Sequence, residues 1–321
     1  MNNSYIKLMM KFWYFNSFLM ILSSNSYFFI WICLEFNILM FIFMTNYLNF
    51  NLINSLMKYF IFQSISSSLL LFVLILMKLN IFNLNIIFFL IIISLWMKLG
   101  MFPFNSWYFQ MTENLNWKIW FLINTLQKFL PLWILSFYFI SNKMTNTLIW
   151  LNSAYSMFEI WNQTSIRWMI NSSSLNHFSW MLMSLSNSMN NIWMTYFFIY
   201  LLLSLILYNF MKMLNWNSMF NILNNLTTKN NKMFSLLLLN FLGMPPFLGF
   251  LPKLLMLINN MTIYLNMILI LNSIMISFMY IYFMLPLMIM NIKNKINNLN
   301  KMNYLMNYAM YCIMFLLLAM I

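Results

Sequence analysis

Apolar segments long enough to cross a lipid bilayer recur along almost the whole chain. Short polar connections, rich in asparagine, separate them. A transmembrane helix needs about 20 consecutive, mostly apolar residues, and the regular polar–apolar alternation of a membrane β-barrel is absent from this sequence. We therefore expect an all-α, multi-pass membrane protein. Its spans, about eleven by this length criterion, are predicted at residues 3–22, 26–44, 54–77, 82–118, 119–140, 147–167, 172–190, 192–213, 233–259, 261–290 and 303–321.

Charged residues are too few to cover a water-exposed surface. The 321 residues are 64% hydrophobic and 6% charged, whereas soluble domains carry roughly 25% charged residues. No connection is long enough to form a domain outside the membrane, so we expect a single membrane domain over residues 1–321. The segment 1–22 lacks a small-residue cleavage site and is expected to form the first span rather than a signal peptide.

Residue usage is biased in a way that side-chain physics does not explain. Val73 is the only valine, and alanine occurs only at positions 154, 309 and 319. Codons rich in adenine and thymine specify most of the favoured residues. The bias therefore indicates an AT-rich coding sequence, typical of an organellar genome.

The net charge of +13 does not predict a nucleic-acid partner, because most lysines lie at the ends of spans. There they can reach the membrane interface and lipid phosphates. Cys33 and Cys312 are isolated, no GxGxxG motif is present, and His177 is the only histidine. These observations predict no disulfide, haem, flavin, iron–sulfur cluster or metal site in this chain.

Two spans carry the same helix-breaking motif, LGMxPF. The first copy contains Gly100 and Pro103, and the second contains Gly243, Pro245 and Pro246. Glycine costs about 1 kcal/mol in a helix interior and proline about 3 kcal/mol. In hydrocarbon such a break survives where it faces protein or a hydrated cavity. A simple proline kink is the alternative for one copy, and two matched copies favour functional breaks.

The two copies also indicate an internal repeat. The leucine that begins the motif is Leu99 in the first copy and Leu242 in the second, so the copies lie 143 residues apart. The same offset moves the start of the first predicted span to the start of the sixth. Each half then holds five spans, and an odd number forces the second half to enter the membrane from the opposite side. We therefore expect inverted halves over residues 1–144 and 145–291, followed by a loop and a C-terminal span over 292–321.

Four charged residues lie deep in predicted spans. Glu35 is near the centre of the span 26–44, Lys98 occupies the last turn before the first break, Lys128 is mid-span, and Lys253 follows the second break. Burial disfavours the charged form of each group, so such residues can gain and lose protons. Together they predict a proton relay inside the membrane. A protonated, inert glutamate is the alternative for Glu35.

Four other polar residues are weaker candidates. His177 is either a relay group or a packing residue that is hydrogen-bonded to neighbouring serines. Lys58 begins a span, so an interface anchor is favoured over a relay role. Glu113 is expected in an interfacial turn, and Arg167 at the end of the span 147–167.

Six segments carry a resemblance to a known family. They are "CLEFNILMF" (33–41), "MKYFIFQSISSSLLLF" (57–72), "KLGMFPFNSWYFQMTENLNW" (98–117), "LQKFLPL" (126–132), "WNQTSIRWMINSSSLNHFSWML" (161–182) and "LNFLGMPPFLGFLPK" (239–253). In this order they resemble the chain 2 family of mitochondrial NADH–ubiquinone oxidoreductase, respiratory complex I, in its arthropod form.

The resemblance implies a proton-pumping, antiporter-like subunit with two inverted five-helix repeats and a central hydrophilic axis. It implies the mitochondrial inner membrane, with accessory subunits, chains 4 and 4L and lipids such as cardiolipin as partners. NADH, FMN, iron–sulfur clusters and ubiquinone would be bound by other subunits.

The motifs also imply residue roles. Glu35 and Lys98 resemble the paired glutamate and broken-helix lysine, Lys128 the central lysine, and Lys253 the lysine of the second broken helix. The chain departs from the family pattern at several positions. Asn105 stands where the family usually has histidine, and Phe109-Gln110 stands where the family has Pro-Glu. Glu159 occupies a position at which the family has glycine.

Two other functions remain open at this point. A subunit of a multi-subunit cation/proton antiporter would share the lysines and the broken helices. A non-catalytic membrane scaffold would hold the same charges dispersed or paired off. A connected, hydrated path among the four charged residues would distinguish a relay from a scaffold.

Overall fold

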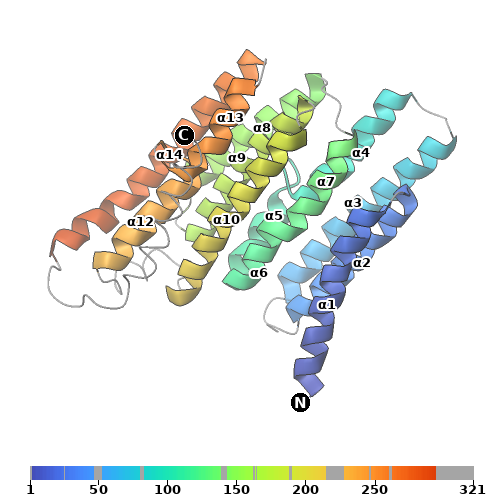
Figure 1. Cartoon of the computed structure of the whole chain (residues 1–321), viewed down its shortest axis with the longest axis horizontal. Helices are drawn as coiled ribbons and strands as arrows, with labels where there is room; N and C mark the ends of the chain where they lie inside the picture. The colour runs from blue at the N-terminus through green and yellow to red at the C-terminus, as the bar shows by residue number, and fades with distance from the viewer. Residues whose placement is uncertain are drawn as a thin grey trace. The chain divides into compact units, whose positions relative to one another are not determined.

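The computed structural model is all-helical, and no strand occurs in the part of the chain that it describes. The chain divides into two compact units, residues 1–142 and 143–321. The described residues, drawn as coloured ribbon in Figure 1, are 2–24, 26–46, 53–79, 83–138, 143–161, 163, 165–187, 190–214, 228–245, 247–259 and 262–293.

The first unit is a group of helices that pack mainly on their neighbours in sequence. Its helices are α1 (Asn2–Ser23), α2 (Tyr27–Asn46), α3 (Ile53–Leu79), α4 (Leu84–Leu99), α5 (Ser106–Asn114), α6 (Trp117–Leu122), the π-helix η2 (Ile123–Gln127) and α7 (Lys128–Tyr138). Helix α1 packs on α2, α2 on α3, and α3 on α4 and α5. The contact of α3 with α5 departs from this sequential order, and so does α7, which returns to pack on α4.

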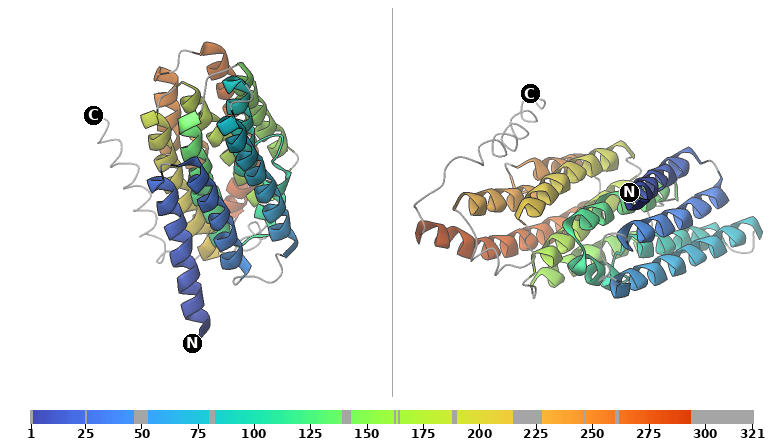
Figure 2. Two further views of the ribbon diagram at one scale, coloured as in Figure 1. Left: turned by 90° about the vertical axis from the view of Figure 1, so that its right-hand side faces the viewer. Right: turned by 90° about the horizontal axis from the view of Figure 1, so that it is seen from below.

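The second unit is built around one buried helix. Its helices are α8 (Lys143–Trp161), α9 (Ile166–Ser186), α10 (Asn190–Leu214), α12 (Thr228–Leu242), the 3-10 helix η3 (Leu248–Phe250), α13 (Leu251–Asn259) and α14 (Ile263–Lys293). Every residue of α9 except Trp168 is buried. Helices α8, α10, α13 and α14 contact it, and α12 runs beside α14 (Figures 1 and 2).

Helix length and composition agree with the predicted membrane protein. In the described part of the chain, five helical stretches are long and apolar enough to span a bilayer: Tyr27–Thr45, Ile53–Leu79, Trp117–Tyr138, Asn191–Met213 and Ile263–Met284. Large apolar side chains such as Phe12, Phe72 and Phe278 point outward, as expected of a surface that faces lipid. The span predicted at 303–321 lies outside the described residues.

Both predicted breaks are confirmed, and they have the same local geometry. Helix α4 ends before Gly100, which has φ +67°, and α12 ends before Gly243, which has φ +69°. These left-handed values favour glycine because a Cβ atom would be strained there. Pro246 lies outside the described residues.

The hydrogen bonds at the two breaks correspond pair by pair. The Gly100 and Met101 amides donate to the Met97 and Trp96 carbonyls at 3.2 and 3.3 Å. At the second break the Gly243 and Met244 amides donate to the Asn240 and Leu239 carbonyls at 3.1 and 3.4 Å. Each set is a Schellman motif, which satisfies carbonyls that the helix end leaves open. The repeated sequence therefore encodes a repeated backbone structure.

The predicted boundary between two spans is wrong at Arg167. The span expected at 147–167 ends at Trp161, and Arg167 is the second residue of the next helix rather than the end of the preceding one. Ser165 has extended backbone geometry, so the helix restarts after it. Glu159 accepts hydrogen bonds from the Tyr155 hydroxyl and, at 2.8 Å, from the Trp168 indole, which ties the end of α8 to the start of α9.

Two further local predictions are corrected. The span predicted at 119–140 begins at Trp117 and contains a π-helix, because Ile123–Gln127 form wider turns than an α-helix. Glu113 lies in helix α5 rather than in a turn, and its side chain is exposed.

Candidate functional site

Lys98 is a buried cation at the end of a half-helix. It lies in the last turn of α4, and only 5% of its surface is exposed. Its own carbonyl accepts a hydrogen bond from the Gln63 side chain of α3 at 3.2 Å. The Lys98 Nζ atom has no hydrogen-bond partner within the described residues. The helix end favours a cation, because the last carbonyls carry partial negative charge.

Glu35 interacts electrostatically with Lys98 from the middle of α2. Glu35 lies near the middle of its helix, as predicted, and its side chain is partly exposed on the surface of the chain. This exposure has a geometric reason. Neighbouring Cys33, Leu34 and Asn37 take the buried face of α2, and Glu35 sits at the edge of that face.

Lys128 is the first residue after the π-helix, and 2% of its surface is exposed. Its ammonium group lies 3.8 Å from the centre of the Tyr108 ring, within the range of a cation–π interaction. The Tyr108 hydroxyl donates to the Asn124 side chain, which belongs to the π-helix itself. Pro131 lies one turn later inside α7.

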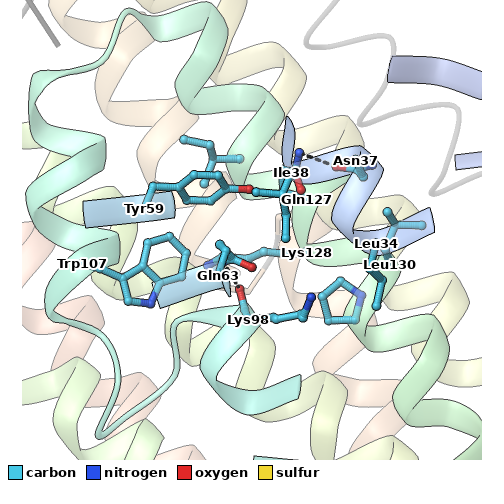
Figure 3. A pocket seen from close by; sticks show the side chains of 12 residues that line it. Leu34, Asn37, Ile38, Tyr59, Gln63, Lys98, Trp107, Gln127, Lys128 and Leu130 are labelled. Atoms are coloured by element: carbon cyan, nitrogen blue, oxygen red, sulfur yellow. Dashed lines mark hydrogen bonds between the residues drawn. The ribbon is translucent and has the colours of Figure 1, made fainter. Parts of the chain in front are cut away.

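A small cavity lies between Lys98 and Lys128 (Figure 3). It offers about 20 Å³ to a water molecule, and roughly 10–15 Å³ of such space is enough to hold one. The residues that line it come from α2, α3, α4, α5, the π-helix and α7: Leu34, Asn37, Ile38, Tyr59, Gln63, Lys98, Trp107, Ile123, Gln127, Lys128, Leu130 and Pro131. The fold of the first unit thus brings two predicted relay lysines to one polar cavity.

The neutral polar residues of this cavity are not among the site residues predicted from the sequence. Gln63, Gln127 and Asn37 lie inside apolar runs, where a polar side chain is costly unless it has a partner. In Figure 3 the Asn37 and Gln127 side chains meet on one side of the cavity, and Gln63 bonds to the Lys98 backbone on the other. Their position within apolar spans was the available signal.

Lys253 and His177 meet at the end of α12 in the second unit. The Lys253 ammonium group donates to the Leu242 carbonyl at 2.6 Å, and the His177 Nε2 atom lies 2.7 Å from the Phe241 carbonyl. A carbonyl only accepts, so Nε2 carries the proton. The other ring nitrogen then accepts from the Tyr196 hydroxyl at 2.9 Å. The second break therefore supplies two successive carbonyls to two basic side chains.

The predicted partners of His177 are wrong. Ser173 and Ser174 donate to backbone carbonyls three residues earlier in α9 instead of bonding the imidazole. Serine hydroxyls in a helix reach such carbonyls easily, which leaves the imidazole free to bond tyrosine and the α12 backbone.

Lys58 and Asn105 are not among the residues that line the cavity. Lys58 is exposed, and its ammonium group donates to the Gln110 side chain of α5 at 2.6 Å. Asn105 precedes α5 and is buried, but its side chain makes no capping bond to that helix. In the part of the chain that the structure describes, no three His, Cys, Asp or Glu side chains lie close enough together to hold a metal ion.

The helices and the buried lysines define a polytopic, all-α membrane protein. Residues 24–279 match the family described as "NADH:quinone oxidoreductase/Mrp antiporter, TM". The chain belongs to this family, and the resemblance found in the sequence is confirmed.

Similar proteins agree with this assignment. NADH-ubiquinone oxidoreductase chain 2 of Anopheles gambiae is 35% identical over 243 residues, which cover 71% of this chain and 69% of the relative. Among solved structures, a chain of Thermus thermophilus respiratory complex I has a TM-score of 0.73 at 14% identity, covering 89% of this chain and 76% of that one.

A chain of the Mrp complex of a Dietzia species has a TM-score of 0.70 at 11% identity. The match covers 87% of this chain and 59% of that one. At these identities the two solved structures establish a shared fold.

Proposed function

We propose that this chain is a proton-translocating subunit of the membrane arm of respiratory complex I. In this role it couples NADH:ubiquinone oxidoreduction, performed in other subunits, to proton movement inside the membrane. The observation that carries the proposal is the cavity that joins Lys98 to Lys128. When one of the two buried lysines is protonated and the other is a neutral amine, a proton can pass from the first to the second through water in this small cavity.

Each relay residue has a distinct part in this proposal. Glu35 is the acidic member of the relay and interacts with Lys98 through space, so a change in the charge of Glu35 affects whether Lys98 keeps its proton. Lys98 then passes a proton through the cavity to Lys128. Lys253, at the end of α12, is the corresponding group of the second half, and His177 is a secondary relay candidate beside it.

The proposal includes an inverted repeat of two five-helix halves, over residues 1–144 and 145–291, with a further transmembrane helix at the C-terminus. Three observations support it. The Schellman motifs at the two breaks are offset by the same 143 residues as the sequence motif, since residue 100 corresponds to 243. The chain also divides into compact units after residue 142. A broken helix in each half is typical of this architecture.

Location and partners follow from the same proposal. Two observations support a place in the mitochondrial inner membrane: residue usage that indicates an AT-rich, organellar coding sequence, and the likeness to NADH-ubiquinone oxidoreductase chain 2. The partners are other membrane-arm subunits, including chains 4 and 4L, accessory subunits and lipids such as cardiolipin. NADH, FMN, iron–sulfur clusters and ubiquinone bind to other subunits, and this chain needs no cofactor of its own.

A cation/proton antiporter subunit is the second candidate, and the likeness to the Mrp complex chain favours it. The relative from Anopheles gambiae supports complex I more strongly, because its identity is 35% rather than 11%. Measurement of NADH oxidation in membranes that contain or lack this chain separates the two. Unchanged NADH:ubiquinone activity without the chain would favour the antiporter.

The relay is tested by replacing Lys98 or Lys128 with methionine, which has a similar length but no charge. We expect the complex to assemble and to lose proton pumping that is coupled to NADH oxidation. Lys143→Met is the matched control, because Lys143 is exposed at the start of α8 and is not among the residues that line this cavity. Full pumping in either cavity variant would support a scaffold role instead.

A further inference from the structure

The π-helix lies directly before Lys128 and sets the direction of its side chain. A π-turn holds one more residue than an α-turn. Each residue of an α-helix turns the chain by about 100°, since 3.6 residues complete one turn. If Ile123–Gln127 became regular α-helix, the residues after them would rotate by about that angle relative to α6. Lys128 would then no longer face the cavity in the same way.

The last residue of the π-helix is held by an amide clamp, by which we mean Gln127, Asn37, Tyr14 and Ser17. The Gln127 amide donates to the Asn37 side chain of α2 at 2.9 Å and to the Tyr14 hydroxyl of α1 at 3.1 Å. Asn37 in turn donates to the Ser17 hydroxyl at 3.0 Å, and Ser17 donates to the Tyr14 carbonyl at 2.6 Å.

The three partners of Gln127 in the clamp are buried, and Gln127 itself is partly buried, so solvent competes only weakly for the groups that it bonds. Tyr14 and Asn37 are each 1% exposed, and Ser17 is fully enclosed. Loss of one partner would leave a buried polar group unsatisfied, which is unfavourable in this environment. The clamp therefore opposes any rotation that takes Gln127 away from α1 and α2.

Helix α2 links the clamp to the acidic member of the proposed relay. Asn37 lies two residues after Glu35, so the same helix carries the carboxylate that interacts electrostatically with Lys98 and the amide that bonds Gln127. A displacement of α2 that follows a charge change at Glu35 would be transmitted to Gln127. Lys128 is the next residue in the chain.

We propose that Gln127 is a positioning residue for Lys128. Its two hydrogen bonds to α1 and α2 keep the π-helix in place and thereby point the Lys128 side chain into the cavity. Through Asn37 the clamp also makes the orientation of Lys128 depend on the position of α2. This inference rests on the proposed relay function, since it assigns Gln127 a role only if Lys128 carries protons.

The test uses the assembled complex in sealed membrane vesicles and measures protons moved per NADH oxidised. Gln127→Leu removes both clamp bonds and replaces the amide with an apolar side chain. We expect the pumping ratio to fall to that of Lys128→Met while NADH oxidation with an artificial acceptor stays unchanged. Ser64→Ala is the control, because the Ser64 hydroxyl donates to the Ile61 carbonyl of its own helix and Ser64 does not line the cavity.

A double-mutant cycle separates positioning from general loss of stability. If Gln127 acts through Asn37, the double variant Gln127→Leu with Asn37→Leu loses no more pumping than the worse single variant. Additive losses, or an unchanged pumping ratio in Gln127→Leu, would overturn the inference. If Gln127→Leu does not assemble, Tyr14→Phe removes one acceptor and keeps the ring. Tyr14→Phe is then expected to lower the ratio partly, and an unchanged ratio overturns the inference.

The same data distinguish failure of this inference from failure of the relay itself. If Lys128→Met pumps normally, the proposed relay is wrong and Gln127 has no role to support. If Lys128→Met stops pumping and Gln127→Leu does not, the relay stands and only the positioning role is refuted.

Discussion

Replacing Gly243 with alanine should disrupt the second helix break more severely than any exposed substitution. Gly243 and Gly249 face each other where the chain turns from α12 into η3. A Cβ atom on Gly243 would lie 2.3 Å from the Gly249 carbonyl oxygen, and one on Gly249 would lie 2.2 Å from the Asn240 carbonyl oxygen. Ordinary contact begins at 3.4 Å, so the backbone would have to move by about 1 Å.

The magnitude follows from two separate costs. Alanine at the left-handed φ of +69° costs about 1–2 kcal/mol. Overpacking against rigid backbone adds about 1–3 kcal/mol. The sum for Gly243→Ala is therefore about 2–5 kcal/mol, and 2 kcal/mol changes the ratio of folded to unfolded protein roughly 30-fold. Gly249→Ala carries only the second cost.

Gly100→Ala gives a graded comparison at the first break. It has a similar φ of +67°, but the nearest atoms to an added Cβ are side-chain atoms of Tyr108 and Trp107, at 2.9 and 3.0 Å. These contacts are longer than the 2.3 Å contact at Gly243, so Gly100→Ala should be milder than Gly243→Ala.

Native gel electrophoresis would measure the amount of assembled complex. The midpoint temperature of thermal inactivation of the complex would measure its stability. Ser68→Ala, on the exposed face of α3, serves as the control. We expect strongly reduced assembly for Gly243→Ala and smaller losses for Gly249→Ala and for Gly100→Ala. Assembly of Gly243→Ala at the control level, with an unchanged inactivation midpoint, would refute the argument that backbone crowding requires glycine here.

Three further outcomes are expected. Tyr108→Leu should lower the proton-pumping rate of vesicles, because it removes the ring beneath the Lys128 ammonium group, an interaction worth about 0.5–2 kcal/mol; Tyr108→Phe should retain most of the rate. Tyr280→Phe should lower the thermal inactivation midpoint of the complex. The Tyr280 hydroxyl lies 2.9 Å from the Met169 carbonyl and 2.8 Å from the Ser173 hydroxyl of α9, and hydrogen bonds between helices contribute about 0.6 kcal/mol each in membrane proteins. Trp168→Phe should increase proteolysis between α8 and α9, because it removes the 2.8 Å bond to Glu159; an unchanged cleavage pattern would contradict the proposed tie between the helices.

Local signals in the sequence located the helix ends that depend on glycine and proline. Gly100 and Gly243 adopt the left-handed conformation that few other residues tolerate, so the breaks could be predicted from the motif alone. The restart of the helix at Ile166 could not, because no glycine or proline marks it. There Glu159 bonds to Tyr155 of α8 and to Trp168 of α9, which fixes the turn between the two helices. The bond to Trp168 depends on how α9 packs on α8.

The sequence also indicated which charges are costly, but not what surrounds them. Lys98, Lys128 and Lys253 lie within apolar runs, and all three are buried. Their partners come from distant segments: Gln63 for the Lys98 backbone, Tyr108 for Lys128 and the α12 backbone for Lys253. Which residues meet across helices depends on helix rotation, and one-dimensional spacing in an almost uniformly apolar span carries little information about rotation.

By itself, the sequence determined the class of fold, the two breaks and the identity of the buried charges. These properties follow from hydrophobicity, from backbone conformations that only glycine adopts easily and from the cost of charge in hydrocarbon. Only the tertiary structure decided that Lys98 and Lys128 share a cavity, that a π-helix precedes Lys128 and that His177 bonds the end of α12. The physical reason is that these features arise from contacts between helices, where a single residue of π-turn or a small rotation changes which side chains meet.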